Sequence, residues 1–229
     1  MSPEIQQKLL EISSLTSRML RKSFGRGPES CQAYLKYRYL VITIRGFLSP
    51  MESILLEHGN VDDIDISRGI VMNNVLAQLR GVLELEFQQD VQDFYHDWNY
   101  TRNTGVIMIV FEQDILPGDN FEPFLEQTPL LDEVNRISEM VQKVPDRTEA
   151  YQITPSIYLV LRVGILITLE KALIAKGFQQ TLLVTKDDLE KGFFHRSGPF
   201  QEIFNQRLSD IFIDWNLNDD NSLMCIVLK

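Results

Sequence analysis

The chain has 229 residues, of which 44% are hydrophobic and 24% charged, an ordinary balance for a soluble globular protein of one or two domains. No apolar run reaches the roughly 20 residues that a membrane-spanning helix needs, and two cysteines are too few for a disulfide scaffold, so we expect a cytoplasmic protein. The net charge of −10 opposes contact with nucleic-acid phosphates, so no nucleic-acid partner is expected.

The first predicted element is an amphipathic helix over residues 3–23, ended by Gly25. Residues 1–45 carry eight Lys or Arg against three acids, a net charge of +5, so the rest of the chain carries −15. Two interpretations of this basic segment stay open. It can contact an anionic membrane surface or a membrane transport protein, which would place the protein at the membrane periphery. Alternatively, it is a solvated helix face whose basic residues offset the helix dipole.

The remainder of the first half predicts two β-hairpins separated by two helices. Residues 31–38 and 39–47 form the first hairpin, because the first strand alternates and the second is β-branched. Ser49-Pro50-Met51-Glu52 is a typical helix start, with Ser at the N-cap and Glu three residues later. A longer helix over about 66–90 and a hairpin of strands 92–100 and 105–112 complete this half.

The second half predicts the same order with one additional strand. Its elements are a helix at 130–143, strands at 149–154 and 157–165, a helix at 168–176 with Thr168 as N-cap, a strand at 181–184, a helix near 187–208, and strands at 209–217 and 222–228.

The two halves also repeat individual residues, which indicates an internal duplication. Asp97-Trp98-Asn99 recurs as Asp214-Trp215-Asn216, 117 residues later. Five further positions recur at an offset of 118 and in the same order: Gly46, Leu48, Glu52, Leu55 and Gly59 match Gly164, Leu166, Glu170, Leu173 and Gly177. Each half is large enough to bury a modest core of its own.

We therefore predict an α+β fold of two tandem repeats. Each repeat is helix, β-hairpin, helix, helix, β-hairpin, with antiparallel strands and the helices on one face. The expected boundaries are 1–114 for the first unit, 115–128 for a linker and 129–229 for a diverged second unit. We also expect the two units to face each other as a pseudo-dimer within the chain.

No catalytic or metal-binding arrangement is recognisable. The three histidines lack metal-ligand spacing, and there is no nucleophile elbow or phosphate-binding loop, so no metal, cofactor or catalytic residue is predicted. The glycines at 25 and 27 follow the end of a helix, whereas phosphate loops precede a helix, so they favour a capping loop. Arg26 can still bind an anion through its side chain.

The repeated Asp-Trp-Asn segment permits two interpretations. Asp97 and Asn99 can point to solvent on a strand whose Trp98 enters the core, as simple alternation predicts. Alternatively, these polar residues form part of a surface that binds a ligand or partner, together with Asp214 and Asn216 of the second copy.

The first half resembles a known family at Gly25-Arg26-Gly27-Pro28, at the strand that ends at Gly46, at Glu52, at Arg80 and around Asp97. Over residues 8–112 it is similar to the MpsC-like family of small bacterial domains, named for a proposed sodium-translocating, membrane-potential-generating system. The family pattern has Lys at position 26 and Thr at the helix start, where this chain has Arg and Ser-Pro. The second half departs further, with Val144-Pro145-Asp146-Arg147 in place of the glycine loop.

The resemblance implies a non-enzymatic, soluble accessory or regulatory protein that is associated with a membrane ion or inorganic-carbon transport system. It supplies no established catalytic residue. The alternative function is a small-molecule or anion-binding domain, with or without catalysis, whose site lies in the first unit or between the units. The residues chosen as candidates for that site are Arg26, Arg45, Arg80, Asp97 and Asn99.

Overall fold

The computed structural model describes residues 2–116 and 121–229. The chain divides into two compact units, residues 1–120 and 121–229. Each is α+β, with one four-stranded antiparallel sheet and a hydrophobic core of its own, which confirms the predicted fold class. The expected linker at 115–128 includes residues 117–120, which lie outside the described residues.

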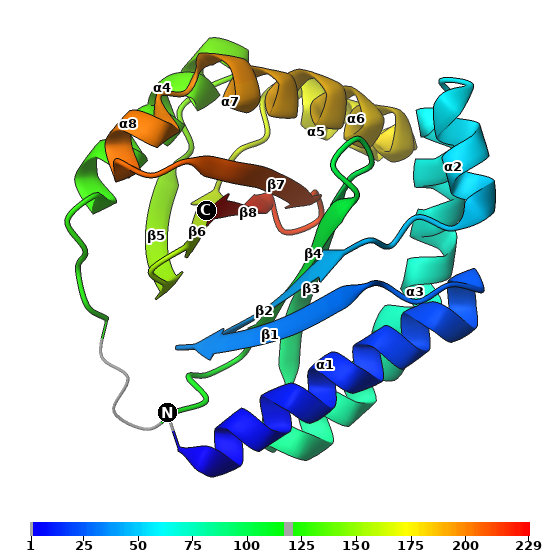
Figure 1. The fold of residues 1–229 in the computed structure, drawn as a ribbon. Helices are drawn as coiled ribbons and strands as arrows, with labels where there is room; N and C mark the ends of the chain where they lie inside the picture. Colours follow the sequence, from blue (N-terminus) through cyan, green and yellow to red (C-terminus); the bar gives the residue numbers. More distant parts are fainter. Residues whose placement is uncertain (1, 117–120) are drawn as a thin grey trace. The chain divides into compact units, whose positions relative to one another are not determined.

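The first unit, drawn from blue to green in Figure 1, contains three helices and four strands among its described residues. These are α1 (Pro3–Phe24), β1 (Ser30–Lys36), β2 (Tyr39–Arg45), α2 (Pro50–Glu57), α3 (Val61–Phe87), β3 (Val91–Asn99) and β4 (Thr104–Phe111). The strand order is β1-β2-β4-β3. The second strands of the two hairpins therefore pair in the middle of the sheet, and β1 and β3 form its edges.

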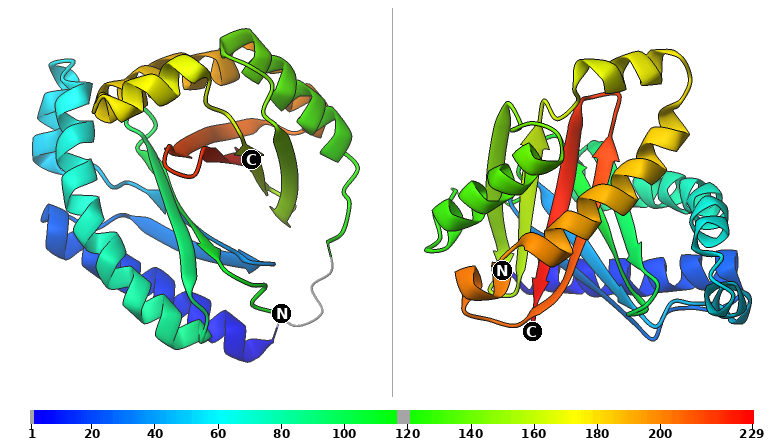
Figure 2. Two further views of the ribbon diagram at one scale, coloured as in Figure 1. Left: turned by 180° about the vertical axis from the view of Figure 1, so that it is seen from behind. Right: turned by 90° about the horizontal axis from the view of Figure 1, so that it is seen from above.

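The core of the first unit lies between this sheet and the helices α1 and α3. The central strands point Leu40 and Ile42 of β2, and Ile107 and Ile109 of β4, at those helices. In Figure 2, α1 and α3 run along this face of the sheet. Alternation along β3 brings Trp98 to the same face, because it pairs with Gly105 of β4. A side chain at position 105 would collide with the indole ring, so glycine is required there.

Local signals explain where the first helices begin and end. Ser2 caps α1, and Gly25 ends it in the left-handed conformation with φ 75°. Ser49 and Glu52 form the predicted capping box at the start of α2. The chain reaches α2 through Gly46 at φ 64°, and the turn residue Asn103 accepts hydrogen bonds from the N–H groups of the two residues that follow this glycine.

The second unit repeats this topology with a longer helical connection. Its elements are α4 (Gln127–Val141), β5 (Arg147–Thr154), β6 (Ile157–Val163), α5 (Thr168–Ala175), α6 (Gln179–Lys186), the π-helical turn η1 (Asp187–Lys191), α7 (Gly192–Ser197), α8 (Phe200–Phe204), β7 (Leu208–Asn216) and β8 (Asn221–Leu228). The strand order β5-β6-β8-β7 corresponds strand for strand to that of the first unit.

Three local predictions for the second unit are wrong. The expected strand at 181–184 is part of helix α6, where Leu182 and Lys186 are buried four residues apart on one face. A short apolar run does not distinguish a strand from a buried helix segment, and here packing against the core decides. The N-cap of α5 is Ile167, not Thr168, so α5 begins one residue earlier than predicted from side-chain preference. The helix expected at about 187–208 is also broken, since Gly198 and Pro199 separate α7 from α8.

Candidate functional site

The first unit buries one ion pair in its core, between Glu52 of α2 and Arg68 of α3. The Oε2 atom of Glu52 accepts the backbone N–H of Ser49 at 2.7 Å, which completes the capping box. Its Oε1 atom accepts the Nε–H of Arg68 at 3.1 Å. Arg68 is only 1% exposed. The helix cap thus fixes the carboxylate that faces the buried arginine.

Three aromatic rings enclose the guanidinium group of Arg68. Its central carbon lies 4.1 Å from the ring centre of Phe24 and 4.3 Å from those of Phe47 and Trp98. These rings come from the end of α1, the loop after β2 and strand β3, respectively. The negative faces of the rings attract the cation. Burial nevertheless lowers the pKa of Arg68, and Glu52 opposes this effect only in part.

The guanidinium group keeps unused donors. Within the described residues, neither Nη1 nor Nη2 of Arg68 has a hydrogen-bond partner. The neighbouring carboxylate, Asp65, accepts a hydrogen bond from the hydroxyl of Tyr100. Burial and Asp65 raise the pKa of that hydroxyl, so it remains a donor at neutral pH. A buried charged donor without an acceptor is costly, and Arg68 has two such nitrogen atoms.

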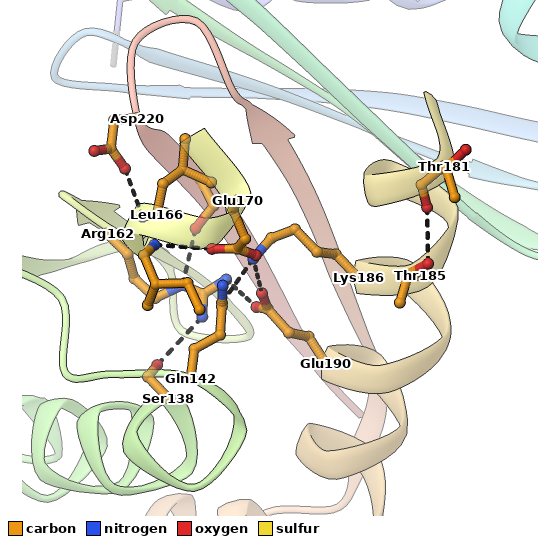
Figure 3. A network of polar contacts seen from close by, with 12 residues as sticks. Ser138, Gln142, Arg162, Leu166, Glu170, Thr181, Thr185, Lys186, Glu190 and Asp220 are labelled. Atoms are coloured by element: carbon orange, nitrogen blue, oxygen red, sulfur yellow. Dashed lines mark hydrogen bonds and ion pairs between the residues drawn. The ribbon is translucent and has the colours of Figure 1, made fainter. Parts of the chain in front are cut away.

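The second unit contains a larger network of buried charges, shown in Figure 3. Arg162 of β6 donates from Nε to Ser222 at 2.8 Å, from Nη1 to Ser138 at 3.2 Å and from Nη2 to Glu190 at 2.8 Å. Glu190 lies in the π-helical turn η1. All three guanidinium nitrogens of Arg162 therefore have partners, in contrast to those of Arg68.

Lys186 is the second cation of this network. Its Nζ lies 2.6 Å from Glu190 and 3.3 Å from Glu170, and it donates to the side chain of Gln142 at 2.7 Å. Burial alone would raise the pKa of Glu190, but Arg162 and Lys186 outweigh it and hold the pKa below its usual range. Two cations and two carboxylates thus balance one another, which is the condition for burying charges without excessive cost.

The two buried sites occupy equivalent positions in the repeat. Glu52 precedes Arg68 by 16 residues, and Glu170 precedes Lys186 by the same 16 residues. Both carboxylates also accept a backbone N–H at the start of a short helix, and that of Glu170 accepts the N–H of Ile167 at 2.9 Å. The carboxylate–cation pair is therefore a shared feature of both units.

The structure places the arginines selected from the sequence at separate points of the first unit. Arg26 is exposed and lies 3.7 Å from Glu29. Arg45 is exposed at the end of β2, where it pairs with Thr104 at the tip of the second hairpin. Arg80 contacts the backbone of Val91, at the start of β3 and thus at the opposite end of the sheet. These three side chains form no common site in the described part of the chain.

The polar residues beside Trp98 have local roles. Asp97 is 7% exposed, so the interpretation in which it points to solvent is wrong. One of its carboxylate oxygens accepts the backbone N–H of Trp98 at 2.6 Å. Asn99 accepts the N–H of Arg102 at 3.0 Å and so stabilises the turn between β3 and β4. Trp98 enters the core, as alternation predicts.

Sequence reasoning missed Arg68 and Lys186, although a signal for them was present. Arg68 lies four residues after Ile64 and four before Met72, on the stripe of α3 that faces the core. Lys186 lies 118 residues after Arg68, and Glu170 lies 118 residues after Glu52. A charged residue on an apolar helix stripe, repeated with its partner carboxylate, indicates a buried pair.

A groove of about 430 Å³ lies between α1 and the edge strand β1. It is lined mainly by apolar groups, among them Leu9, Leu10 and Ala33, together with the thiol of Cys31. Burial raises the pKa of Cys31 to about 12, so the thiol is protonated at neutral pH and is a poor nucleophile.

The described residues contain neither a metal-site cluster nor a helix suited to span a membrane. No group of three or more His, Cys, Asp or Glu residues there has the arrangement of a metal site. None of the helices in residues 2–116 and 121–229 combines the length and the apolar character that crossing a bilayer requires.

Comparison with known proteins gives one match, and it covers the first unit. Residues 4–113 match a family described as "Na+-translocating membrane potential-generating system (MpsC)". No curated protein and no solved structure matches the chain. The matched range contains the capped helix α2, the Glu52–Arg68 pair and both hairpins of the first unit. Over residues 4–113 the chain is therefore similar to the MpsC family.

Proposed function

We propose that this protein is a non-enzymatic accessory component of a sodium-translocating membrane system. The observation that carries the proposal is the family match over residues 4–113, whose description names such a system. The protein acts in this proposal as a regulatory or assembly partner of the membrane-embedded components. A narrower form of the proposal assigns that system to inorganic-carbon uptake.

A basic surface on the first unit supports contact with a membrane. Near its end, α1 exposes Arg18, Arg21 and Lys22, and Arg26 follows in the next loop. Arg18 bonds to a serine, and Arg26 lies beside Glu29 as an exposed pair, so both keep most of their charge available. Each basic residue near an anionic lipid surface contributes about 1 kcal/mol. We therefore propose that this basic surface, Arg18, Arg21, Lys22 and Arg26, lies against anionic headgroups.

Vesicle flotation tests the membrane contact. The whole protein is mixed with vesicles of phosphatidylcholine alone or with added phosphatidylserine, at low and physiological salt. We expect the protein to float only with the anionic vesicles, and less so at higher salt. The variant Arg18→Gln/Arg21→Gln/Lys22→Gln/Arg26→Gln is expected to stay at the bottom of the gradient.

A matched control removes four exposed basic residues from the second unit, as Arg147→Gln/Lys176→Gln/Arg196→Gln/Arg207→Gln. It changes the net charge equally, so it is expected to float like the wild-type protein. If the wild-type protein floats with neither vesicle, the membrane contact is wrong. If both variants lose binding equally, net charge rather than the basic surface is responsible.

The role in sodium translocation is tested in the organism that encodes the chain. Deletion of the gene is expected to lower the sodium-dependent membrane potential of inverted membrane vesicles, and a plasmid copy is expected to restore it. An unchanged potential after deletion contradicts the proposed function. A defect in growth on limiting bicarbonate would support the narrower assignment to inorganic-carbon uptake.

A further inference from the structure

The hydrogen-bond donors of Arg68 outnumber the acceptors around it. An arginine side chain carries five N–H groups. The one on Nε is used by Glu52, and the four on Nη1 and Nη2 have no acceptor among the residues that the structure describes. Buried charged donors without acceptors are rare in native proteins, and each calls for a water, an ion or a ligand.

The second unit shows how the same position is satisfied internally. Lys186, the counterpart of Arg68, has a second carboxylate, Glu190, one helical turn further along the chain. The residue one turn after Arg68 on α3 is Met72, which is fully buried and offers no acceptor of comparable strength. The first unit therefore lacks, at this position, the acceptor that the second unit contains.

We propose that the first unit binds a small oxyanion of carboxylate-like geometry on the Nη1 and Nη2 atoms of Arg68. The guanidinium fork matches two oxygens of a planar anion, with two parallel hydrogen bonds. The rings of Phe24, Phe47 and Trp98 lie within 4.3 Å of the guanidinium carbon and bind the cation, while the N–H edge receives the anion. This assignment goes beyond the accessory role and does not depend on it.

The two carboxylates near Arg68 leave its Nη1 and Nη2 atoms without a hydrogen bond. Glu52 faces the Nε atom, and Asp65 is engaged by the hydroxyl of Tyr100, so neither carboxylate bonds to Nη1 or Nη2. Burial is the largest effect on the pKa of Arg68 and lowers it, although Glu52 and Asp65 oppose the shift. Of the three rings, Phe24 alone is partly exposed, so the anion enters by displacement of this ring at the end of α1.

The two tryptophans supply a direct readout with an internal control. Trp98 contacts Arg68, whereas Trp215 belongs to the second unit, and the chain has no other tryptophan. The indole N–H resonances of the ¹⁵N-labelled full chain are followed during titration with formate, acetate or nitrate, against chloride at constant ionic strength. We expect the Trp98 signal, assigned with Trp98→Phe, to shift and saturate with the oxyanions while the Trp215 signal stays in place.

Three variants test the assignment to Arg68. Arg68→Lys keeps the charge but loses the fork, so we expect binding at least tenfold weaker. Met72→Glu supplies the carboxylate that Glu190 supplies in the second unit, so we expect no saturable shift. Met72→Leu keeps the position apolar and is expected to bind like the wild-type chain. The Trp215 signal and the rest of the spectrum report whether each variant is folded.

Several outcomes overturn the proposal. A folded wild-type chain that shows no saturable oxyanion effect would mean that water satisfies Nη1 and Nη2. If chloride binds as tightly as the oxyanions, the anion is not held by two parallel hydrogen bonds. If Met72→Glu binds the oxyanions as the wild-type chain does, Arg68 is not the binding residue. If Met72→Glu does not fold, Met72→Gln presents a neutral acceptor at the same position and is expected to weaken binding. A failure here leaves the sodium-translocation assay unaffected, so the two proposals fail separately.

Discussion

Two residue positions decide how buried charge is balanced in each unit. At the offset of 118, Arg162 and Glu190 of the second unit correspond to Ile44 and Met72 of the first. The residues at these two positions are buried in both units. The first unit thus has an apolar pair where the second has an ion pair. Since desolvation opposes a buried ion pair, the charged version need not be the more stable one.

Replacement of the Arg162–Glu190 ion pair by the apolar residues of the first unit should not destabilise the second unit. Glu190→Met alone leaves Arg162 and Lys186 with one carboxylate, Glu170, and should lower the free energy of unfolding by about 3–5 kcal/mol. The double variant Arg162→Ile/Glu190→Met installs the residues of the first unit and keeps the Lys186–Glu170 pair. It should be near wild-type stability or up to about 4 kcal/mol more stable. Urea unfolding in a Trp98→Phe background, followed by Trp215 fluorescence, measures both, and a double variant as unstable as the single one contradicts the argument.

At the scale of elements, strands were easier to predict than helix ends. Alternating or β-branched apolar residues located all eight strands of the described chain to within about two residues. The helix start at Ser49 was also predictable, since its capping box is local. The start of α5 was not, because its N-cap residue is Ile167, which makes no side-chain hydrogen bond to the helix. An apolar residue at the N-cap leaves no signal of the usual kind in the sequence.

The capping box of α2 has a measurable role that can be separated from packing. Ser49→Ala removes the oxygen that accepts the N–H of Glu52 at 3.3 Å. We expect a loss of about 1 kcal/mol in the free energy of unfolding, with a range of about 0.5–2 kcal/mol. Ser53→Ala, in the same helix, removes a hydroxyl that only bonds back to the carbonyl of Ser49, and it should be neutral or slightly stabilising. Equal losses in the two variants would show that the cap contributes nothing specific.

At the scale of the whole molecule, the similarity of the two units was recognised in the sequence, whereas their buried charges were overlooked. The repeated glycines mark equivalent bends, since Gly46 and Gly164 have φ values of 64° and 68°. Those residues recur because the backbone requires them. Arg68 was overlooked because exposed arginines were sought as binding residues, whereas this one lies within the core. The facing arrangement of the two units stays a prediction.

The unequal charge networks predict that acid weakens the second unit through Glu190. Because its pKa is lowered in the folded state, the unfolded chain binds a proton more readily, and stability falls as the pH drops below about 4.5. Asp220 adds to this effect: burial would raise its pKa, but Lys171 and the N–H of Leu166 lower it below its usual range. In the variant Trp98→Phe, Trp215 is the one remaining tryptophan, so tryptophan fluorescence follows the unfolding of the second unit.

The free energy of unfolding, measured by urea titration between about pH 6 and about pH 3, should therefore decline with acid in that variant, by at most about 1.4 kcal/mol per pH unit for each proton taken up. Adding Glu190→Gln should lower stability at neutral pH, because two buried cations lose a counter-charge, and it should also flatten the decline. Asp220 continues to titrate in both proteins, so a residual slope is expected. If the slope with the added Glu190→Gln substitution equals the slope of the Trp98→Phe parent, the ion pairs of Glu190 do not govern the acid sensitivity of the second unit.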